Sequence, residues 1–424
     1  MRVTVVGGGI GGLTAALSLG AAGIEVRVLE AARRLEPLGV GINLLPPAVR
    51  ELVELGLGAA LAGVGIPTAE LVYHDRFGSR IWSEPRGVGA GYRWPQYSIH
   101  RGDLQMLLVA AVRERLGGDA VRTGTVFEGF RQDGDEVHLE LRDRSTGSRS
   151  AMSSDVLVGA DGIHSAVRRQ LHPEEGPPVW NGIQMWRGVT ETDPFLSGRS
   201  MIMAGSNSHA KFVAYPISRA AEDRGRAAVN WVAEVRLPPG GLLESGDWNR
   251  RGRVAEVLPH FASWRFEWLD IPALITGAPA VFEYPMVDRD PLPSWSAGRV
   301  TLLGDAAHPM YPIGSNGASQ AVIDGRVLAW ELARHEHPVQ ALAAYDAARR
   351  EATAALVLAN RQMGPEKVLR IVSERAPDGF DSVEDVMSAA ELAAIARDYK
   401  LTAGFEVDAL NERPSWDVAG VSLP

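Results

Sequence analysis

The sequence predicts an α/β protein in which a parallel sheet carries an inserted, largely antiparallel second sheet and is followed by a helical C-terminal region. Three observations support this class. Residues 3–29 have the pattern of a buried strand, a small-residue helix and a second strand. Most segments of residues 183–287 alternate with period two, as antiparallel strands do. Residues 316–334 and 341–361 have the pattern of long helices that follow a further buried strand.

A glycine-rich turn, GGGIGG at residues 7–12, separates the first strand from the first helix. It matches G-x-G-x-x-G at Gly7, Gly9 and Gly12. Gly7 permits the tight turn, Gly9 lets the backbone approach a pyrophosphate, and Gly12 lets the helix pack closely on the strands. The N–H groups at the helix N-terminus then point at the phosphates. Glu30 lies 18 residues past Gly12, where a carboxylate can bind an adenosine ribose. Together these features predict a Rossmann-like, dinucleotide-binding unit.

The alternative for this stretch is a signal peptide or a membrane helix, because residues 3–24 are uncharged and long enough to cross a bilayer. Seven glycines interrupt that run, and a strand pattern precedes them. A signal peptide would also discard a complete βαβ unit. We therefore reject this alternative and expect no membrane span.

The composition is that of an ordinary globular protein, with 46% apolar and 22% charged residues in a chain of 424. The formal charge is −9 and no long basic run occurs, so nucleic acid is not an expected partner. Cysteine is absent, which excludes disulfides, thiolate metal sites and cysteine nucleophiles. No metal site is expected, and the absence of cysteine fits a cytoplasmic location.

The order of patterns along the chain predicts a discontinuous first domain. A hairpin pattern follows the first 70 residues, and the buried strand at residues 299–305 returns the chain to the first sheet. The predicted division is residues 1–70, 98–180 and 288–362 for the first domain, 71–97 and 181–287 for the second sheet, and 363–424 for a helical tail.

Three buried strands end in turns that suit a ligand. These turns are residues 7–12, Asp161-Gly162 and Gly304-Asp305, and more than a hundred residues separate each from the next. Because ligands of open α/β sheets bind at the carboxyl ends of the strands, all three turns can meet at one molecule.

These three motifs resemble the signatures of single-component FAD-dependent aromatic hydroxylases. The residues that carry the resemblance are G-x-G-x-x-G, the D-G-x-x-S-x-x-R of residues 161–168 and GDAAHP at residues 304–309. Within the family, GVGINL, YSIHRGDLQM, MWRGVTE, YPMVDRDPLP and LLGDAAHPMYPIGSNGASQA resemble the 5-methylphenazine-1-carboxylate monooxygenase and salicylate hydroxylase type. The resemblance extends to about residue 365, and the tail beyond Glu366 matches nothing.

The resemblance implies a reaction. NAD(P)H would reduce bound FAD, the reduced flavin would capture O2, and a C4a-hydroperoxyflavin would hydroxylate a planar aromatic substrate, carboxylated or phenolic. Since no second G-x-G-x-x-G exists, NAD(P)H is expected to bind only transiently. Two alternatives remain open: an FAD-dependent reductase or dehydrogenase that does not use O2, and a flavin-binding redox sensor without turnover. The oligomeric state, monomer or homodimer, stays open.

The resemblance also implies residue roles. Glu30 would bind the adenosine ribose, Arg101 and Gln105 the pyrophosphate and ribityl region, Val126 the adenine through its backbone, and Asp305 the ribityl chain. The loop of residues 312–318 would lie beside the isoalloxazine, where a helix N-terminus stabilises negative charge on reduced flavin. The full set of expected cofactor residues is Gly7, Gly9, Ile10, Gly11, Gly12, Glu30, Ala31, Val40, Arg101, Gln105, Val126, Asp161, Asp305, Gly314, Asn316, Gly317 and Ala318.

Alternation in the second sheet predicts which side chains share a face. Met185 and Arg187 point together, as do Val213 and Tyr215. If these four line the flavin side, the pocket is flat and apolar, with one cation for a carboxylate or phenolate. Tyr215 is the candidate for hydrogen-bonding a ring hydroxyl and the only candidate catalytic residue. The expected substrate-binding residues are Met185, Arg187, Val213, Trp231, Pro312 and Gly314.

Each of these assignments has a structural alternative. The four sheet residues could be ordinary core, with Arg187 paired to a neighbouring acid. Asp161 could only cap its helix, with Ser165 as a second cap, and Asp305 could do the same at its own turn. His308 is expected to be a structural loop histidine held by backbone contacts.

Overall fold

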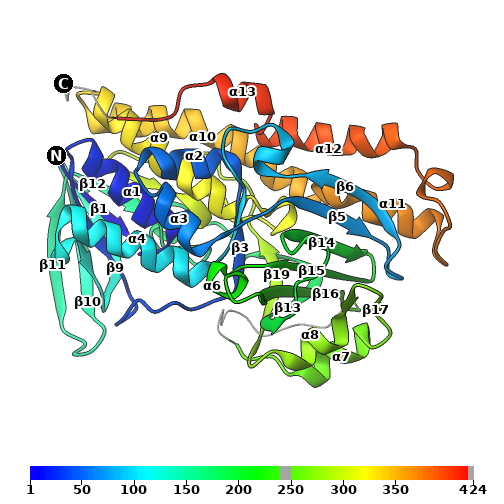
Figure 1. The fold of residues 1–424 in the computed structure, drawn as a ribbon. Helices are drawn as coiled ribbons and strands as arrows, with labels where there is room; N and C mark the ends of the chain where they lie inside the picture. The colour runs from blue at the N-terminus through cyan, green and yellow to red at the C-terminus, as the bar shows by residue number, and fades with distance from the viewer. Residues whose placement is uncertain (239–249, 419–424) are drawn as a thin grey trace.

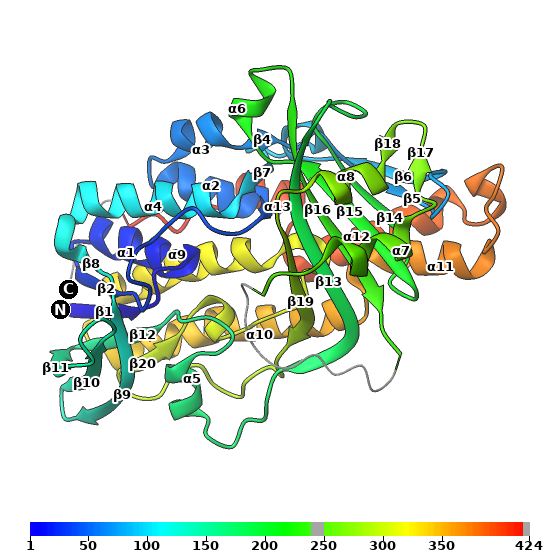
Figure 2. The same ribbon diagram turned by 90° about the horizontal axis from the view of Figure 1, so that it is seen from below.

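The computed structural model describes residues 1–238 and 250–418, and Figure 1 shows their arrangement. A parallel sheet with its helices forms one end of the molecule, and a larger sheet forms the other (Figures 1 and 2). The N-terminus lies at the end that carries the parallel sheet (Figure 1). No helix of the described residues is long and apolar enough to cross a membrane.

The parallel sheet forms because its strands β20 (Val300–Leu302), β12 (Val156–Gly159) and β1 (Arg2–Val6) are mostly apolar and buried, so they can be covered on both faces. The strands lie in the order β20, β12, β1, β2 (Glu25–Leu29) and β8 (Val121–Arg122). Three helices pack side by side next to it, α1 (Ile10–Ala21), α4 (Arg101–Leu116) and α9 (Gly317–Arg334), with α1 in the middle (Figure 2). An antiparallel sheet packs on β1 and β12 through apolar side chains: β9 (Thr125–Asp133), β10 (Glu136–Asp143) and β11 (Arg149–Ser154).

The second sheet has seven strands and is antiparallel except where β14 pairs with β5. Its strand order is β19 (Val281–Asp288), β13 (Val179–Thr192), β16 (Ala227–Arg236), β15 (Ala210–Pro216), β14 (Ser200–Gly205), β5 (Glu70–His74) and β6 (Arg80–Pro85). The hairpin expected after residue 70 is thus part of this sheet.

The two faces of the seven-stranded sheet are both buried, but against different partners. One face, the outer face, packs under α7 (Val254–Phe261) and α8 (Ile271–Gly277) and carries Trp186, Phe212 and Trp231. The other, the inner face, carries Met185, Val213 and Tyr215 and packs toward Tyr311 and Ile313 of the first domain. The alternation predicted for these strands is therefore confirmed.

The C-terminal helices run along the molecule past both sheets (Figure 1). They are α10 (Pro338–Arg361), the short η5 (Gly364–Glu366), α11 (Lys367–Arg375), α12 (Ala389–Ala403) and α13 (Val407–Glu412), with η6 (Val383–Asp385) between α11 and α12. The tail beyond residue 362 packs on the inner face through Val368, Leu369 and Leu392. It is therefore part of the core that surrounds the junction of the two domains.

The remaining elements are short and connect these layers. They are β3 (Gly41–Leu44), α2 (Pro46–Glu54), α3 (Gly58–Val64), β4 (Ile66–Pro67), η1 (Gly87–Ala90), β7 (Tyr97–His100), η2 (Gly118–Ala120), α5 (Ala166–Leu171), α6 (Arg219–Glu222), β17 (Arg265–Phe266), β18 (Leu269–Asp270), η3 (Gly304–Ala306) and η4 (Ile313–Ser315).

Several helices have other bounds than the sequence pattern predicts. Apolar residues at a spacing of three or four predict one helix over residues 46–61, but the structure has two, because Gly56 adopts φ +73 and breaks the run. The pattern predicts a helix from Leu104, which begins at Arg101, and a tail helix over residues 382–399, which is α12. It predicts one helix over residues 253–262 across the second sheet, but α8 follows α7 because Pro272 and an Asp270 cap begin a new helix.

Candidate active site

The glycine-rich turn has the geometry that its spacing predicts. Gly7 adopts φ +113, and a Cβ there would lie 2.2 Å from the carbonyl oxygen of Ala160. A Cβ on Gly12 would lie 2.1 Å from the carbonyl oxygen of Gly7, so helix α1 can begin only with glycine at that position. A Cβ on Gly9 would meet nothing within 4 Å. Gly9 thus leaves its backbone open at the N-terminus of α1, as a pyrophosphate requires.

Glu30 is fixed at the end of β2. Its Oε2 accepts a hydrogen bond from the Gly8 N–H at 2.8 Å, and its Oε1 accepts one from the Ala32 N–H at 2.6 Å. Gln105 of α4 donates to the Gly8 carbonyl oxygen at 2.7 Å. Each carboxylate oxygen keeps a second lone pair, so Glu30 can still accept from ribose hydroxyls.

The arginine of the motif at residues 161–168 binds the backbone of the motif at residues 304–309. Arg168 of α5 is 1% exposed and donates to the carbonyl oxygens of Ala306 and Ala307 at 3.0 and 2.8 Å. Its other donors form a paired contact with Glu175. The arginine of D-G-x-x-S-x-x-R therefore holds the turn that follows β20, although the two motifs are more than a hundred residues apart.

Asp161 has the capping role that the sequence allowed as an alternative. Its Oδ1 accepts from the Ser165 hydroxyl at 2.5 Å, and its Oδ2 accepts from the Ala166 N–H at 2.7 Å. Ser165 in turn accepts from the Arg168 N–H at 2.9 Å. A cofactor contact of the Asp161 carboxylate stays a prediction.

His308 is a buried structural residue, but its partner is not the expected one. Its backbone N–H donates to the Gly304 carbonyl oxygen at 2.8 Å, but its imidazole is held by a side chain, since Nε2 lies 2.5 Å from Asp324 of α9. Asp324 also accepts from Arg349 at 2.7 Å and from the Gly304 N–H at 3.0 Å. Burial disfavours the charge of Asp324, but the neighbouring His308 and Arg349 outweigh it and lower its pKa to about 2. A charged Asp324 thus fixes the turn that carries Asp305.

Unlike Asp324, Asp305 is exposed to solvent, although many protein atoms lie near its carboxylate. That combination places it on the wall of a cleft. The surrounding protein raises its pKa, and the neighbouring His308 and Arg101 oppose this shift. Arg101, at the start of α4, is exposed. Asp305 and Arg101 are therefore near enough to interact electrostatically, and the expectation that they share one ligand stays a prediction.

The loop of residues 312–318 holds an unusual backbone. Gly314 and Ser315 have φ of +68 and +59. A Cβ on Gly314 would lie 2.1 Å from the hydroxyl oxygen of Tyr399, which is in α12. That hydroxyl lies 2.5 Å from Asn316 Nδ2 and 2.9 Å from Asn360 Oδ1. Tyr399 thus holds the loop that leads into α9, and sequence reasoning missed it because the tail carries no recognisable motif.

Met185, Arg187, Val213 and Tyr215 share the inner face, as expected. Arg187 has no carboxylate partner in the described part of the chain; its Nη2 donates to the Gly41 carbonyl oxygen at 2.7 Å. Burial raises the pKa of Tyr215, and the neighbouring Arg187 charge opposes that shift. Whether these residues bind substrate stays a prediction.

Asn230 is a further residue that the sequence did not indicate. It is 0% exposed, and its Oδ1 accepts from the Gly41 N–H at 2.7 Å. Asn230 and Arg187 thus bind both polar groups of Gly41. A Cβ on Gly41 would lie 2.6 Å from the Asn230 Cβ, so this glycine is required for the close approach of the two segments. No spacing rule connects positions 41, 187 and 230.

The prediction that Trp231 binds substrate is wrong. Trp231 is 0% exposed on the outer face, where its ring stacks on Phe212 with centroids 6.0 Å apart. Its Nε1 donates to Thr190 at 3.1 Å. In β16 the residues that face inward are Asn230 and Val232, because Trp231 pairs with Gly188 and Ala214 in the neighbouring strands.

The remaining expected cofactor residues lie around this cleft. Thr125, next to Val126, donates its N–H to the Glu30 carbonyl oxygen at 2.9 Å, so Val126 follows a residue that is bound to Glu30. The Val40 carbonyl accepts from the Arg101 N–H at 2.9 Å. Gly11 packs on Leu303, where a Cβ would lie 2.7 Å from a methyl carbon, so its role is packing. The others lie in the glycine-rich turn, after β2 and at the start of α9: Ile10, Ala31, Gly317 and Ala318.

Comparison with known proteins agrees with this geometry. The FAD-binding domain family matches residues 1–251 and 283–360. This chain belongs to that family. It is a single-component FAD-dependent aromatic hydroxylase. The open backbone at Gly9, the fixed Glu30 and the accessible Asp305 fit FAD, and these residues would hold it.

Named relatives cover nearly the whole chain. A phenazine 1,6-dicarboxylic acid hydroxylase of Lysobacter antibioticus is 49% identical over 400 residues, 94% of this chain and 96% of the relative. A 3-hydroxybenzoate 6-hydroxylase of Aquipseudomonas alcaligenes is 33% identical, covering 83% and 86%. The structure of Klebsiella pneumoniae HpxO with FAD and uric acid superposes with a TM-score of 0.74 at 26% identity, covering 98% and 97%.

Proposed function

We propose that this FAD-dependent hydroxylase consumes NAD(P)H and O2 and hydroxylates a planar aromatic carboxylic acid. The observation that carries the proposal is the inner face, which presents Met185, Val213 and Tyr215 beside the guanidinium of Arg187, a cation with no carboxylate partner among the described residues. Arg187 keeps a buried Nε that no described residue satisfies, so a substrate carboxylate would complete its hydrogen bonds. The two relatives named above both act on aromatic carboxylic acids by their names, which supports this substrate class.

The protein residues divide the work. Bound FAD supplies the redox chemistry and the activation of O2. Glu30, Arg101 and Asp305 hold the cofactor at the strand ends. Arg187 orients the substrate through its carboxylate, and the Tyr215 hydroxyl contacts a ring substituent. The apolar inner face excludes water from the reacting atoms.

The test is a screen with purified holoprotein. Phenazine-1-carboxylate, phenazine-1,6-dicarboxylate, salicylate and 3-hydroxybenzoate are added to NADH or NADPH and O2, and NAD(P)H oxidation and products are measured. We expect at least one of these acids to accelerate flavin reduction in stopped flow and to yield a product that carries one atom from ¹⁸O2. The matching decarboxylated aromatics serve as controls and should stimulate less.

Two results would contradict the proposal. Turnover without ¹⁸O in the product would favour a reductase or dehydrogenase. Flavin reduction indifferent to every aromatic acid, with no product formed, would favour a redox sensor.

A further inference from the structure

Three ionisable side chains from distant parts of the chain meet in the interior. Lys211 of β15 lies 2.9 Å from Glu234 of β16 and 2.5 Å from Glu366 of η5. All three side chains are at most 4% exposed. We call them the buried triad. It is unusual because charged groups are rarely buried this completely, and the proposed reaction does not yet use it.

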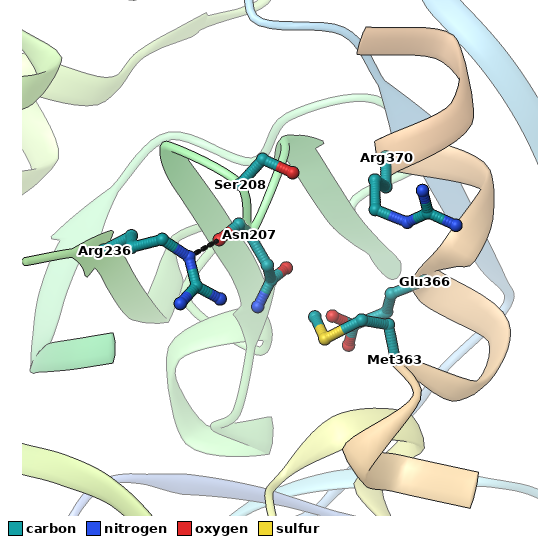
Figure 3. A pocket seen from close by; sticks show the side chains of 6 residues that line it. All are labelled: Asn207, Ser208, Arg236, Met363, Glu366 and Arg370. Carbon is teal, nitrogen blue, oxygen red and sulfur yellow. Dashed lines mark hydrogen bonds between the residues drawn. The ribbon is translucent and has the colours of Figure 1, made fainter. Parts of the chain in front are cut away.

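The triad adjoins a pocket of about 370 Å³ between the second sheet and α11. In Figure 3, side chains from the sheet and from the tail face each other across this pocket. Its lining residues are Asn207, Ser208, Arg236, Met363, Glu366 and Arg370. Arg236 and Arg370 are exposed, so the pocket opens to solvent beside them. Glu366 thus belongs both to the triad and to the pocket wall.

The other side of the triad faces the candidate active site. Lys211 and Val213 are two residues apart in β15, as are Glu234 and Val232 in β16, so the triad continues the inner face. The backbone N–H of Gly314, in the loop of residues 312–318, donates a hydrogen bond to the Glu366 carboxylate. The triad therefore lies between a solvent pocket and the loop expected beside the flavin.

The triad has one more carboxylate than it has ammonium groups. Burial raises the pKa of Glu366 from 4.5 to about 7, with the Glu234 charge acting in the same direction and Lys211 opposing it. Burial disfavours the charge of Lys211, but the two carboxylates outweigh it and raise its pKa. Lys211 therefore stays charged beside Glu234, and the triad can bind one additional proton at Glu366 near neutral pH.

Further polar groups around Glu366 are two tyrosines, an arginine and an asparagine. Tyr399 of α12 and Tyr73 of β5 are buried, and burial raises the pKa of both phenols far above neutrality. Arg370 lines the pocket from α11 and is paired with Glu374 at 2.9 Å. Asn207 donates to Glu234 at 2.8 Å, while its buried Oδ1 has no hydrogen-bond partner among the described residues and is an acceptor on the pocket wall.

We propose that Glu366, supported by Lys211 and Glu234, exchanges protons between the solvent pocket and the flavin-facing side of the active site. The inference rests on the proposed function, because that reaction takes one proton from solvent: NAD(P)H, H⁺, O2 and Ar–H give NAD(P)⁺, Ar–OH and H2O. Glu366 as carboxylic acid releases its proton toward the site, where it ends in the water formed. Water in the pocket then returns a proton to the carboxylate, and the Lys211 charge balances both states.

The first test is the pH dependence of turnover for Glu366→Gln, with Glu374→Gln on the exposed face of α11 as the matched control. For the wild type we expect kcat to fall as pH rises through about 7, since the donor is then ionised. Glu366→Gln should lower kcat at pH 6 by about tenfold or more. The kcat of this variant should not fall as pH rises through about 7, and its KM for the aromatic acid should be unchanged. Glu374→Gln should behave as the wild type.

A second readout needs no turnover. Infrared spectra of wild-type holoprotein should contain the carbonyl band of a protonated carboxylic acid that disappears near pH 7, and Glu366→Gln should lack it. Because the folded pKa lies above the unfolded value, the folded state holds a proton that the unfolded state releases, so this stabilisation is lost as pH rises toward 7. The Tm difference between wild type and Glu366→Gln should therefore change between pH 5 and 8.

The outcomes are distinguishable. A wild type that hydroxylates, with Glu366→Gln retaining the same kcat and the same step near pH 7, would overturn the proton-exchange role alone. The role would also be overturned if Glu366→Gln lost FAD or stability while its kcat kept the step near pH 7. That result would indicate that Glu366 contributes to packing only. If the variant does not fold, absence of the titrating band in the wild type overturns the inference. A wild type that never hydroxylates removes the proposed function itself.

Discussion

At the scale of single residues, Arg187 has two tasks that compete for one guanidinium. Its Nη2 donates to the Gly41 carbonyl oxygen, the guanidinium also interacts with the Tyr215 side chain, and Nε has no hydrogen-bond partner among the described residues. The arginine therefore connects the inner face of the sheet to the backbone of β3, and in the proposed function it carries the charge that selects an acid.

Replacing Arg187 by Met should raise KM for the aromatic acid about 10- to 100-fold, because a charge-assisted hydrogen bond is lost. Tyr215→Phe should lower kcat more than it raises KM, because the hydroxyl contacts the ring substituent. Steady-state kinetics check both variants after their FAD content has been measured. Arg187→Lys retains charge without the planar fork and should fall between Met and the wild type. Unchanged constants in both variants would place the substrate elsewhere.

Trp231 provides the contrasting case on the opposite face. Trp231→Leu should reduce the free energy of unfolding by about 3 kcal/mol, because it leaves a cavity beside Phe212. KM for the aromatic acid should not change, since the sheet backbone separates Trp231 from the inner face. Chemical denaturation and kinetics on the same preparation decide the matter. If Trp231→Leu raised KM and left the free energy of unfolding unchanged, Trp231 would have to be a substrate-binding residue.

At the scale of elements, the candidate site depends on the turn after β20, which buried side chains of other elements hold in place. Arg168 binds the carbonyl oxygens of Ala306 and Ala307, and Asp324 binds His308 and the Gly304 N–H. These contacts leave Asp305 as the residue of that turn that faces the cleft.

Asp305→Ala should weaken FAD binding by about tenfold or more, because the carboxylate would no longer accept a hydrogen bond from a ribityl hydroxyl. His308→Ala should lower thermal stability, with a much smaller effect on FAD affinity, because Asp324 retains Arg349 and the Gly304 N–H. Fluorescence titration of the apoproteins with FAD measures both. Equal loss of affinity in the two variants would show that the roles within this turn are misassigned.

At the scale of the whole molecule, the tail beyond residue 362 completes the site. Tyr399 binds the loop of residues 312–318, and Glu366 joins that loop to Lys211 of the second sheet. Three segments that are remote in sequence thus fix the relative position of the FAD-binding domain and the second sheet.

Tyr399→Phe should weaken FAD binding by roughly fivefold, equivalent to about 1 kcal/mol, because the contacts of its hydroxyl with Asn316 and Asn360 disappear. The matched control is Tyr92→Phe, whose hydroxyl binds the Phe405 carbonyl oxygen at another point of the tail. That change should lower Tm without altering FAD affinity. If both variants bind FAD as tightly as the wild type does, the tail does not position the loop.

The sequence by itself determined the features that depend on neighbouring residues. The glycine spacing, the acid at position 30 and the alternation of β13, β15 and β16 follow from local sterics and strand geometry, so the FAD-binding unit and the sharing of faces could be predicted. The arginine of the second motif was identifiable by its spacing, although the turn that it holds was not.

Only the tertiary structure decided which face of the second sheet meets the first domain and which residues of the tail reach it. Alternation separates Trp231 from Asn230 but cannot say which of them faces inward, because that depends on strand register and on the packing of α7 and α8 over one face. The contacts of Gly41 with Arg187 and Asn230, and of Glu366 with Lys211, join positions more than 140 residues apart. Such contacts arise when buried polar groups find partners during the packing of whole elements, and no local pattern encodes them.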